Sequence, residues 1–224
     1  MLKSLKVENF KSIVDKDICL KNLNVLTGLN GSGKSSILQI LALLKQSINN
    51  NETGEKLFLF GNLLSLGKSK DILSEYSTSN NIKFNIELIN NENNESSTIN
   101  LNYSINDYEN ADVIKGYVDG NINDLRSVLN NLQYIQADRI SPRSSYPQAG
   151  TFNRESGWLG NNGEYTIDFI NQNENFLVSE NRSMKDQYSS IDSAFRNAIA
   201  PTLQLNDQIS AWLQEISPGA QIAT

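Results

Sequence analysis

The chain has 224 residues, a net charge of −6, a single cysteine and no histidine. These counts exclude Ser-His-Asp and Cys-His catalysis, histidine-ligated zinc and a disulfide framework. The pI of about 4.8 rules out a basic nucleic-acid footprint over the whole chain, although a local basic groove stays open. The sequence has no apolar run long enough for a membrane span and no signal-peptide pattern, so we expect a cytoplasmic protein without membrane contact.

The first 50 residues predict a hairpin, a short strand, a loop and a helix. Residues 2–8 and 13–20 alternate apolar and polar side chains, as two antiparallel strands do. Residues 24–27 are expected to form a short buried strand that runs into a glycine-rich loop. From Lys34 onward, apolar residues recur at intervals of three and four, which predicts a helix to about Ser47.

The glycine-rich loop, GLNGSGKS at residues 28–35, satisfies the phosphate-binding pattern G-x-x-x-x-G-K-[ST] at every position. Glycines let the main chain approach phosphate closely, and successive N–H groups at the start of a helix form a nest for anions. Lys34 can reach the β- and γ-phosphates and Ser35 can ligate Mg²⁺. The predicted binding residues are Gly28, Asn30, Gly31, Ser32, Gly33, Lys34, Ser35 and Ser36. A turn that binds nothing is disfavoured by the predicted strand and helix on either side, so ATP and Mg²⁺ are the expected cofactors.

The rest of the chain predicts an antiparallel insertion followed by a helical segment. The predicted elements are a hairpin at 57–66 turning at Gly61-Asn62, a longer hairpin from 82–89 and 97–105, a helix at 123–132, a buried strand at 133–137, an irregular loop at 138–163, and helices at 164–171, 189–199 and 206–216. We therefore divide the chain into a nucleotide-binding lobe, residues 1–137, and a loop with a helical segment, residues 138–224. The fold class is mixed α+β.

Three carboxylates are candidates for the Mg²⁺-binding position that P-loop ATPases have at the end of an apolar strand. Glu87 lies in an alternating strand and is expected to face solvent, Asp138 follows an apolar run interrupted by glutamine, and Asp168 falls in a helical pattern. Structural roles are therefore favoured for all three.

The opening LKVENFKSI and the stretch LTGLNGSGKSSILQIL together resemble the N-terminus of ABC-type ATPases of the SMC, RecF and OLD-nuclease kind. The chain is more similar still to compact bacterial AAA-type ATPases, several of which serve anti-phage defence, including Septu-type systems. The likeness extends through LFLFGNLLSLGKSKDIL, LQYIQADRISPR, WLGNNGEYTIDFI and ISAWLQEI. In this family the signature motif, the Walker B carboxylate and the catalytic Glu lie further toward the C-terminus. The resemblance therefore implies the first lobe of an ABC-type head, either truncated or completed by a partner chain, with hydrolysis requiring the other half.

The resemblance also implies roles for residues outside the loop. Lys11 and Ser12 match positions that often approach the nucleotide phosphates; a plain hairpin turn is the alternative. Gln136 lies where the Q-loop glutamine, a sensor of the γ-phosphate and Mg²⁺, is expected. The implied partners are a second copy or another chain that completes an ATP sandwich, with DNA and a nuclease as further partners.

Two questions stay open from the sequence alone. Arg139, Arg143 and Arg154 form a basic cluster beside the irregular loop, and it either is solvated or contacts DNA phosphates. The chain as a whole is either part of an ATPase that acts on DNA or in anti-phage defence, or a nucleotide-dependent regulatory or assembly module without hydrolysis. A small-molecule kinase is disfavoured, because no arginine-rich lid for an acceptor is recognisable.

Overall fold

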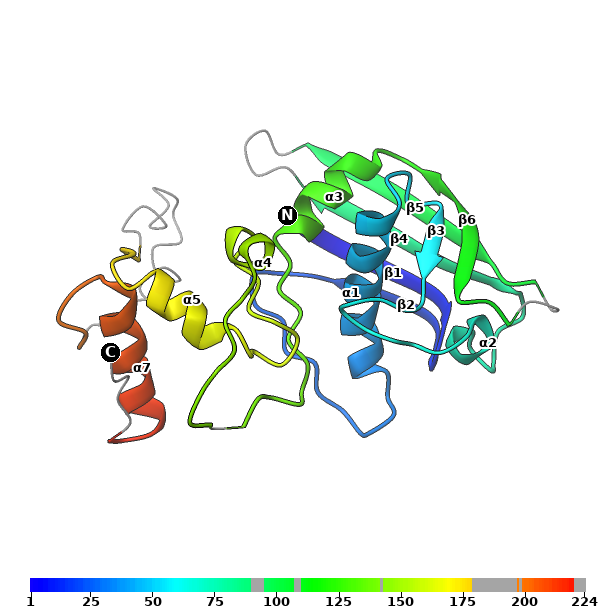
Figure 1. Cartoon of the computed structure of the whole chain (residues 1–224). Helices are drawn as coiled ribbons and strands as arrows, with labels where there is room; N and C mark the ends of the chain where they lie inside the picture. Colours follow the sequence, from blue (N-terminus) through cyan, green and yellow to red (C-terminus); the bar gives the residue numbers. More distant parts are fainter. Residues whose placement is uncertain (90–94, 107–109, 142, 179–196, 198, 220–224) are drawn as a thin grey trace. The chain divides into compact units, whose positions relative to one another are not determined.

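The computed structural model describes residues 1–89, 95–106, 110–141, 143–178, 197 and 199–219 (Figure 1). The chain divides into two compact units, Met1–Tyr134 (unit 1) and Ile135–Thr224 (unit 2). Antiparallel strands together with helices confirm the mixed α+β class. Over the described ranges, no helix has both the length and the apolar character that crossing a bilayer requires.

Unit 1 contains one six-stranded antiparallel sheet with the order β2-β1-β4-β5-β6-β3. The strands are β1 (Leu2–Phe10), β2 (Ile13–Cys19), β3 (Lys56–Phe58), β4 (Asn81–Ile89), β5 (Ser96–Ser104) and β6 (Val113–Asp119). The predicted hairpins β1–β2 and β4–β5 are confirmed. The pairing of β1 with β4 joins segments about 80 residues apart, so the N-terminal strand lies inside the sheet between β2 and β4.

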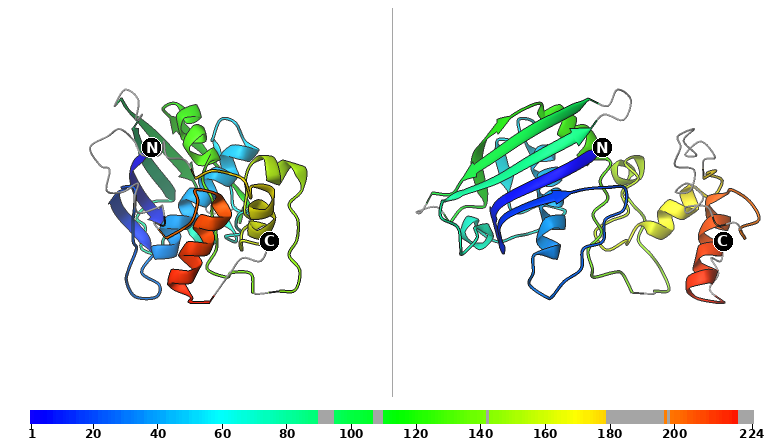
Figure 2. Two further views of the ribbon diagram at one scale, coloured as in Figure 1. Left: turned by 90° about the vertical axis from the view of Figure 1, so that its left-hand side faces the viewer. Right: turned by 180° about the vertical axis from the view of Figure 1, so that it is seen from behind.

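One face of the sheet forms the core because apolar residues occupy alternate positions along the strands. Phe10, Phe84 and Tyr103 lie on this face, with ring centroids 5.8 Å and 6.2 Å apart in successive pairs. Helices α1 (Lys34–Asn50) and α3 (Ile122–Asn130) cover the same face, as two views of the molecule show (Figures 1 and 2). The opposite face is polar and includes the Lys6–Glu8–Lys83 ion-pair network.

Helix α1 also organises the turn that follows β3. Its Gln46 side chain is buried, donates to the carbonyl oxygen of Phe58 at 2.9 Å, and accepts from the N–H groups of Leu63 and Leu64 at 3.1 Å each. The chain reverses through a bond from Gly61 N–H to Leu64 O, close to the predicted turn. The short helix α2 (Ser69–Ile72) follows. A polar residue on the buried side of α1 thus fixes a segment that lacks regular structure.

Two predicted strands are absent. Residues 24–27 and 133–137 have no strand structure, and the Leu23 and Val25 side chains are 82% and 75% exposed. The prediction was wrong because a short apolar run becomes a strand only when a neighbouring strand takes up its N–H and C=O groups. Within the described chain, no backbone hydrogen bond joins residues 22–27 to another segment.

The described residues of unit 2 form loops and helices. The helices are α4 (Thr151–Glu155), α5 (Thr166–Gln172) and α7 (Leu205–Ile216). Helices α5 and α7 confirm two of the three predicted helices, and α7 ends just before Pro218-Gly219 as expected. The third, at 189–199, lies outside the described residues except for Asn197 and Ile199. The predicted irregular loop contains α4, which the sequence pattern did not indicate.

Candidate nucleotide-binding site

The glycine-rich loop has a backbone that only glycine adopts readily. Gly28, Gly31 and Gly33 have φ angles of +146°, +81° and +89°. A Cβ atom added at Gly31 would meet nothing within 4 Å, so backbone conformation alone requires glycine there. Gly33 is the left-handed residue directly before α1. The loop therefore curls tightly and passes into the helix.

The start of α1 supplies the hydrogen-bond donors of an anion site. The first intrahelical bond runs from Ile37 N–H to Gly33 O at 3.2 Å, so the N–H groups of the preceding three residues are not used within the helix. These belong to Lys34, Ser35 and Ser36. Unused N–H groups and the positive end of the helix dipole favour a phosphate at this point.

Lys34 spans the mouth of the loop. Its Nζ donates to the carbonyl oxygens of Gly28 and Leu29 at 2.7 Å and 2.6 Å. These bonds hold a positive charge over the glycine backbone, where the phosphate oxygens of a nucleotide would lie. A triphosphate would compete with the two carbonyl oxygens for the ammonium N–H donors.

The residues present fit ATP and Mg²⁺. The positive-φ glycines leave room for phosphate, Lys34 supplies a charge, and Ser35 is an exposed hydroxyl at the first turn of α1. Mg²⁺ takes few ligands from protein and completes its shell with phosphate oxygens and water. No group of three or more His, Cys, Asp or Glu side chains suited to a metal occurs among the described residues. Ser35, with the nucleotide itself, is thus the natural ligand in this unit.

The β1–β2 turn contacts the loop through Ser12. The position of a Cβ on Gly33 lies 3.0 Å from Ser12 Oγ and 3.3 Å from Ile13 Cγ1. Asn9 and Lys11, with φ of +61° and +51°, give the turn a shape uncommon for residues other than glycine. Strained backbone of this kind concentrates at functional sites.

Lys11 reaches the side of α1. Its Nζ donates to Gln39 Oε1 at 2.8 Å, and burial lowers the pKa of its ammonium group. The backbone N–H of Lys11 donates to Ile72 O at 2.8 Å. Ser12 is therefore the turn residue in contact with the phosphate loop, and a phosphate role for Lys11 stays a prediction.

Gln136 belongs to unit 2, where its backbone N–H donates to Asn161 O at 2.7 Å. It lies in an irregular segment in place of the predicted strand end. Its role as a γ-phosphate and Mg²⁺ sensor stays a prediction.

Two of the three candidate carboxylates are engaged in ion pairs. Glu87 projects from the polar face of the sheet and accepts from Lys3 Nζ at 2.7 Å, a bond that lowers the pKa of its carboxyl group. Asp168 is buried and accepts from Arg154 Nε and Nη2 at 3.0 Å and 3.1 Å, which lowers its pKa as well. Both side chains thus have the structural roles expected of them.

The complete G-x-x-x-x-G-K-[ST] pattern, a loop of positive-φ glycines, a helix that begins directly after it and a lysine over that loop define the class of P-loop nucleotide-binding proteins. A family model described as "AAA domain, putative AbiEii toxin, Type IV TA system" matches residues 23–218, most of the chain, and the chain belongs to this family. It is an AAA-type P-loop ATPase domain, for which ATP is the expected ligand. A search of curated proteins finds no match.

Proposed function

We propose that this chain is the ATP-binding lobe of a dimerising ABC-type, SMC-like ATPase of the cytoplasm. Its phosphate loop would hold one side of an ATP molecule, and a second copy or a partner chain would complete the sandwich with a Walker B and a signature motif. The loop geometry and the family match support nucleotide binding. The family description names a "putative AbiEii toxin, Type IV TA system", and with the resemblance of the sequence to anti-phage ATPases it motivates the role in defence that we propose.

The observation that supports a second chain at the ATP site is the exposed segment before the phosphate loop. Leu23 and Val25 are 82% and 75% exposed, and the described chain offers residues 22–27 no backbone partner. Exposed apolar side chains beside unpaired N–H and C=O groups are the features of a strand that lacks its neighbour. A strand from a partner chain would bury these side chains and fix the loop from its N-terminal side.

In this assembly each group of the chain has a defined task. The N–H groups at the start of α1 and the Lys34 ammonium would hold the β- and γ-phosphates, and Ser35 would hold Mg²⁺. Bound Mg²⁺ neutralises phosphate charge. Binding would close the dimer and hydrolysis would open it, so that nucleotide acts as a switch.

The second candidate function is a regulatory or assembly module that binds nucleotide and never hydrolyses it. The engagement of Glu87 and Asp168 in ion pairs is consistent with it, because it leaves only Asp138 of the three candidate carboxylates to hold Mg²⁺ or orient water. DNA and a nuclease remain proposed partners in both cases.

The test is a titration of Mg-ATP against the chain and its Lys34→Ala variant, with binding and phosphate release recorded together. We expect binding by the chain, loss of at least about tenfold in affinity in the variant, and negligible turnover by either. Turnover restored by a partner chain supports the sandwich, whereas a complete partner complex that binds ATP without turnover supports the regulatory module. Robust turnover by the chain alone contradicts both.

A further inference from the structure

Unit 2 contains a hollow of about 520 Å³ that the proposed ATP site does not use. It is formed by one stretch of chain that folds back on itself. Gln136 N–H donates to Asn161 O at 2.7 Å, and Ile140 N–H donates to Asn162 O at 3.0 Å. These bonds tie the two sides of the hollow together. The polar lining residues are Asp138, Arg139, Ser141, Arg143, Asn162 and Glu164.

Both arginines of the hollow lack an ion-pair partner among the residues that the structure describes. In the described chain, neither Arg139 nor Arg143 forms a salt bridge, although two carboxylates line the same space. Arg154 differs, because both of its bonds go to Asp168. The basic cluster expected from the sequence is therefore reduced to two guanidinium groups that share one hollow.

The Glu164 carboxylate is turned toward its own backbone. Its Oε2 accepts from Asn162 N–H at 2.8 Å, and its carboxyl carbon lies 2.2 Å from the position of a Cβ on Gly160. Only glycine at 160 leaves the space that this carboxylate occupies. Glu164 thus forms part of the wall of the hollow, whereas the Asp138 carboxylate, which also lines the hollow, is exposed.

The lining selects a ligand that has both anionic and neutral polar groups. Guanidinium forks match phosphate oxygens in geometry and charge. A volume near 520 Å³ is in the range of small-ligand sites and exceeds what a lone phosphate ion fills. The Ser141 hydroxyl, the Asn162 amide and the Asp138 carboxylate can bond to the N–H groups of a base and, in RNA, to the ribose 2′-hydroxyl.

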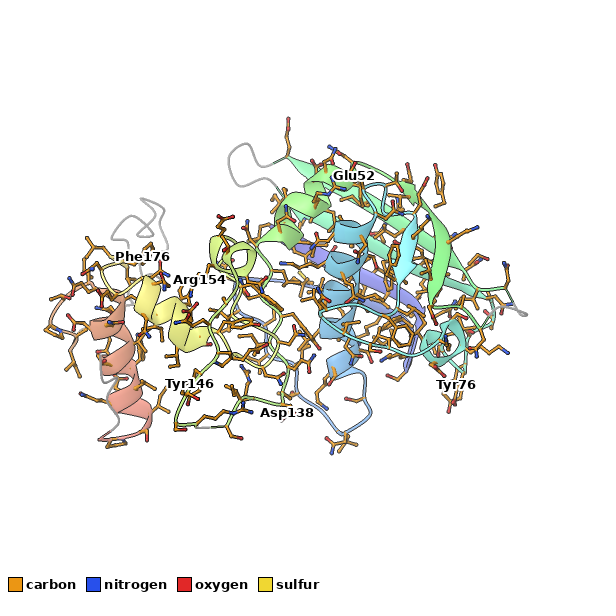
Figure 3. All side chains as sticks on the ribbon, in the orientation of Figure 1. Glu52, Tyr76, Asp138, Tyr146, Arg154 and Phe176 are labelled. Atoms are coloured by element: carbon orange, nitrogen blue, oxygen red, sulfur yellow. The ribbon has the colours of Figure 1, made fainter. Side chains whose placement is uncertain are left out.

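We propose that this hollow binds one nucleoside of a single-stranded nucleic acid together with the phosphates on either side of it, one held by Arg139 and the other by Arg143. A single strand is favoured because its base edges are not occupied by pairing. The proposal deepens the nucleic-acid part of the proposed function and rests on it. Figure 3 labels Asp138 and Tyr146 on the loop that carries the hollow.

The test uses the full chain with Lys34→Ala, so that the phosphate loop cannot hold the oligonucleotide. Binding of a labelled single-stranded oligonucleotide of about 12 nucleotides, as DNA and as RNA, is followed by fluorescence anisotropy at several salt concentrations. Replacing both Arg139 and Arg143 by alanine should weaken binding about tenfold or more. The slope of log affinity against log salt should fall by about 1.4, because each phosphate contact to a single strand contributes about 0.7.

Two control variants separate a built site from general charge. Arg126→Ala removes one positive charge from α3 in unit 1, where this side chain donates to Glu52 O at 2.7 Å, and should leave binding unchanged. Replacing Arg139 and Arg143 by lysine keeps the two positive charges but removes the guanidinium groups that can donate two parallel hydrogen bonds to a phosphate. This variant should bind the oligonucleotide with intermediate affinity. Tryptophan fluorescence of Trp158 and Trp212, both in unit 2, verifies that each variant is folded.

The results of these measurements separate the nucleic-acid site in the hollow from the proposed ATP site. A folded double-alanine variant that binds the oligonucleotide like its parent overturns the proposal, as does an equal loss from Arg126→Ala. Displacement of the oligonucleotide by free AMP or GMP at equal phosphate concentration identifies a mononucleotide as the ligand. That result overturns the proposal that the hollow binds a single-stranded nucleic acid. Mg-ATP binding, measured with Lys34 intact, is independent of these results. Loss of ATP binding with oligonucleotide binding retained rejects the ATP lobe alone, and the reverse result rejects the hollow alone.

Discussion

The contact between the β1–β2 turn and the phosphate loop predicts that two neighbouring glycines respond differently to alanine. Gly31→Ala should cost about 1–2 kcal/mol of unfolding free energy, because its φ of +81° places a Cβ in the left-handed region and nothing lies within 4 Å. Gly33→Ala carries the same strain at +89° and adds a close approach to Ser12 Oγ at 3.0 Å. We expect about 1 kcal/mol more for that contact.

The assay is chemical unfolding of the full chain followed by far-UV circular dichroism, which reports the sheet of unit 1. A double-mutant cycle with Ser12→Ala isolates the contact, since removing Oγ should return part of the extra loss at Gly33 and none of the loss at Gly31. ATP affinity should fall more in Gly33→Ala, because Lys34 follows directly. Equal losses for the two glycine variants, with no coupling to Ser12, would refute the contact.

Two further predictions concern buried polar groups. Tyr103→Phe removes a buried hydroxyl that donates to Gly54 O at 2.7 Å, and it should lower the free energy of unfolding by about 1–3 kcal/mol. Tyr117→Phe, on a 66% exposed ring, should change it by no more than about 0.5 kcal/mol. Urea unfolding compares the two variants, and similar losses would contradict the hydrogen bond from Tyr103. The Arg154 guanidinium lowers the pKa of Asp168, so this pair stabilises unit 2 fully above the ordinary aspartate pKa of about 4 and loses its effect as pH falls through the lowered value. Asp168→Asn should therefore flatten the acid limb of the stability of unit 2, followed by tryptophan fluorescence; an unchanged acid limb would show that the pair contributes nothing.

Local patterns were sufficient for much of unit 1. The apolar spacing after Lys34 predicts α1 because a helix has 3.6 residues per turn, and alternation predicts β1, β2, β4 and β5 because a strand has a period of two. The phosphate loop is also a local feature, since its conformation depends on which positions are glycine. These signals need no knowledge of distant residues.

The expected strands at 24–27 and 133–137 show where local patterns fail. Their apolar runs satisfy the composition of a buried strand, but a strand also needs a neighbour to receive its hydrogen bonds, and that neighbour cannot be deduced from the run itself. Gln46 is a residue whose burial the local pattern does not predict, because a polar side chain on a helix is expected at the surface. It is buried because its amide forms hydrogen bonds with three backbone groups of a distant segment.

The sequence by itself thus determined the phosphate loop, the helix that follows it and the strands with clear alternation. The tertiary structure decided that β1 lies between β2 and β4, that Ser12 contacts Gly33, and that Arg154 pairs with Asp168 while Arg139 and Arg143 line a hollow. The reason is physical. A conformation set by a residue and its immediate neighbours is written in the local pattern, whereas a contact between distant residues depends on how the whole chain satisfies its apolar surface and polar groups together.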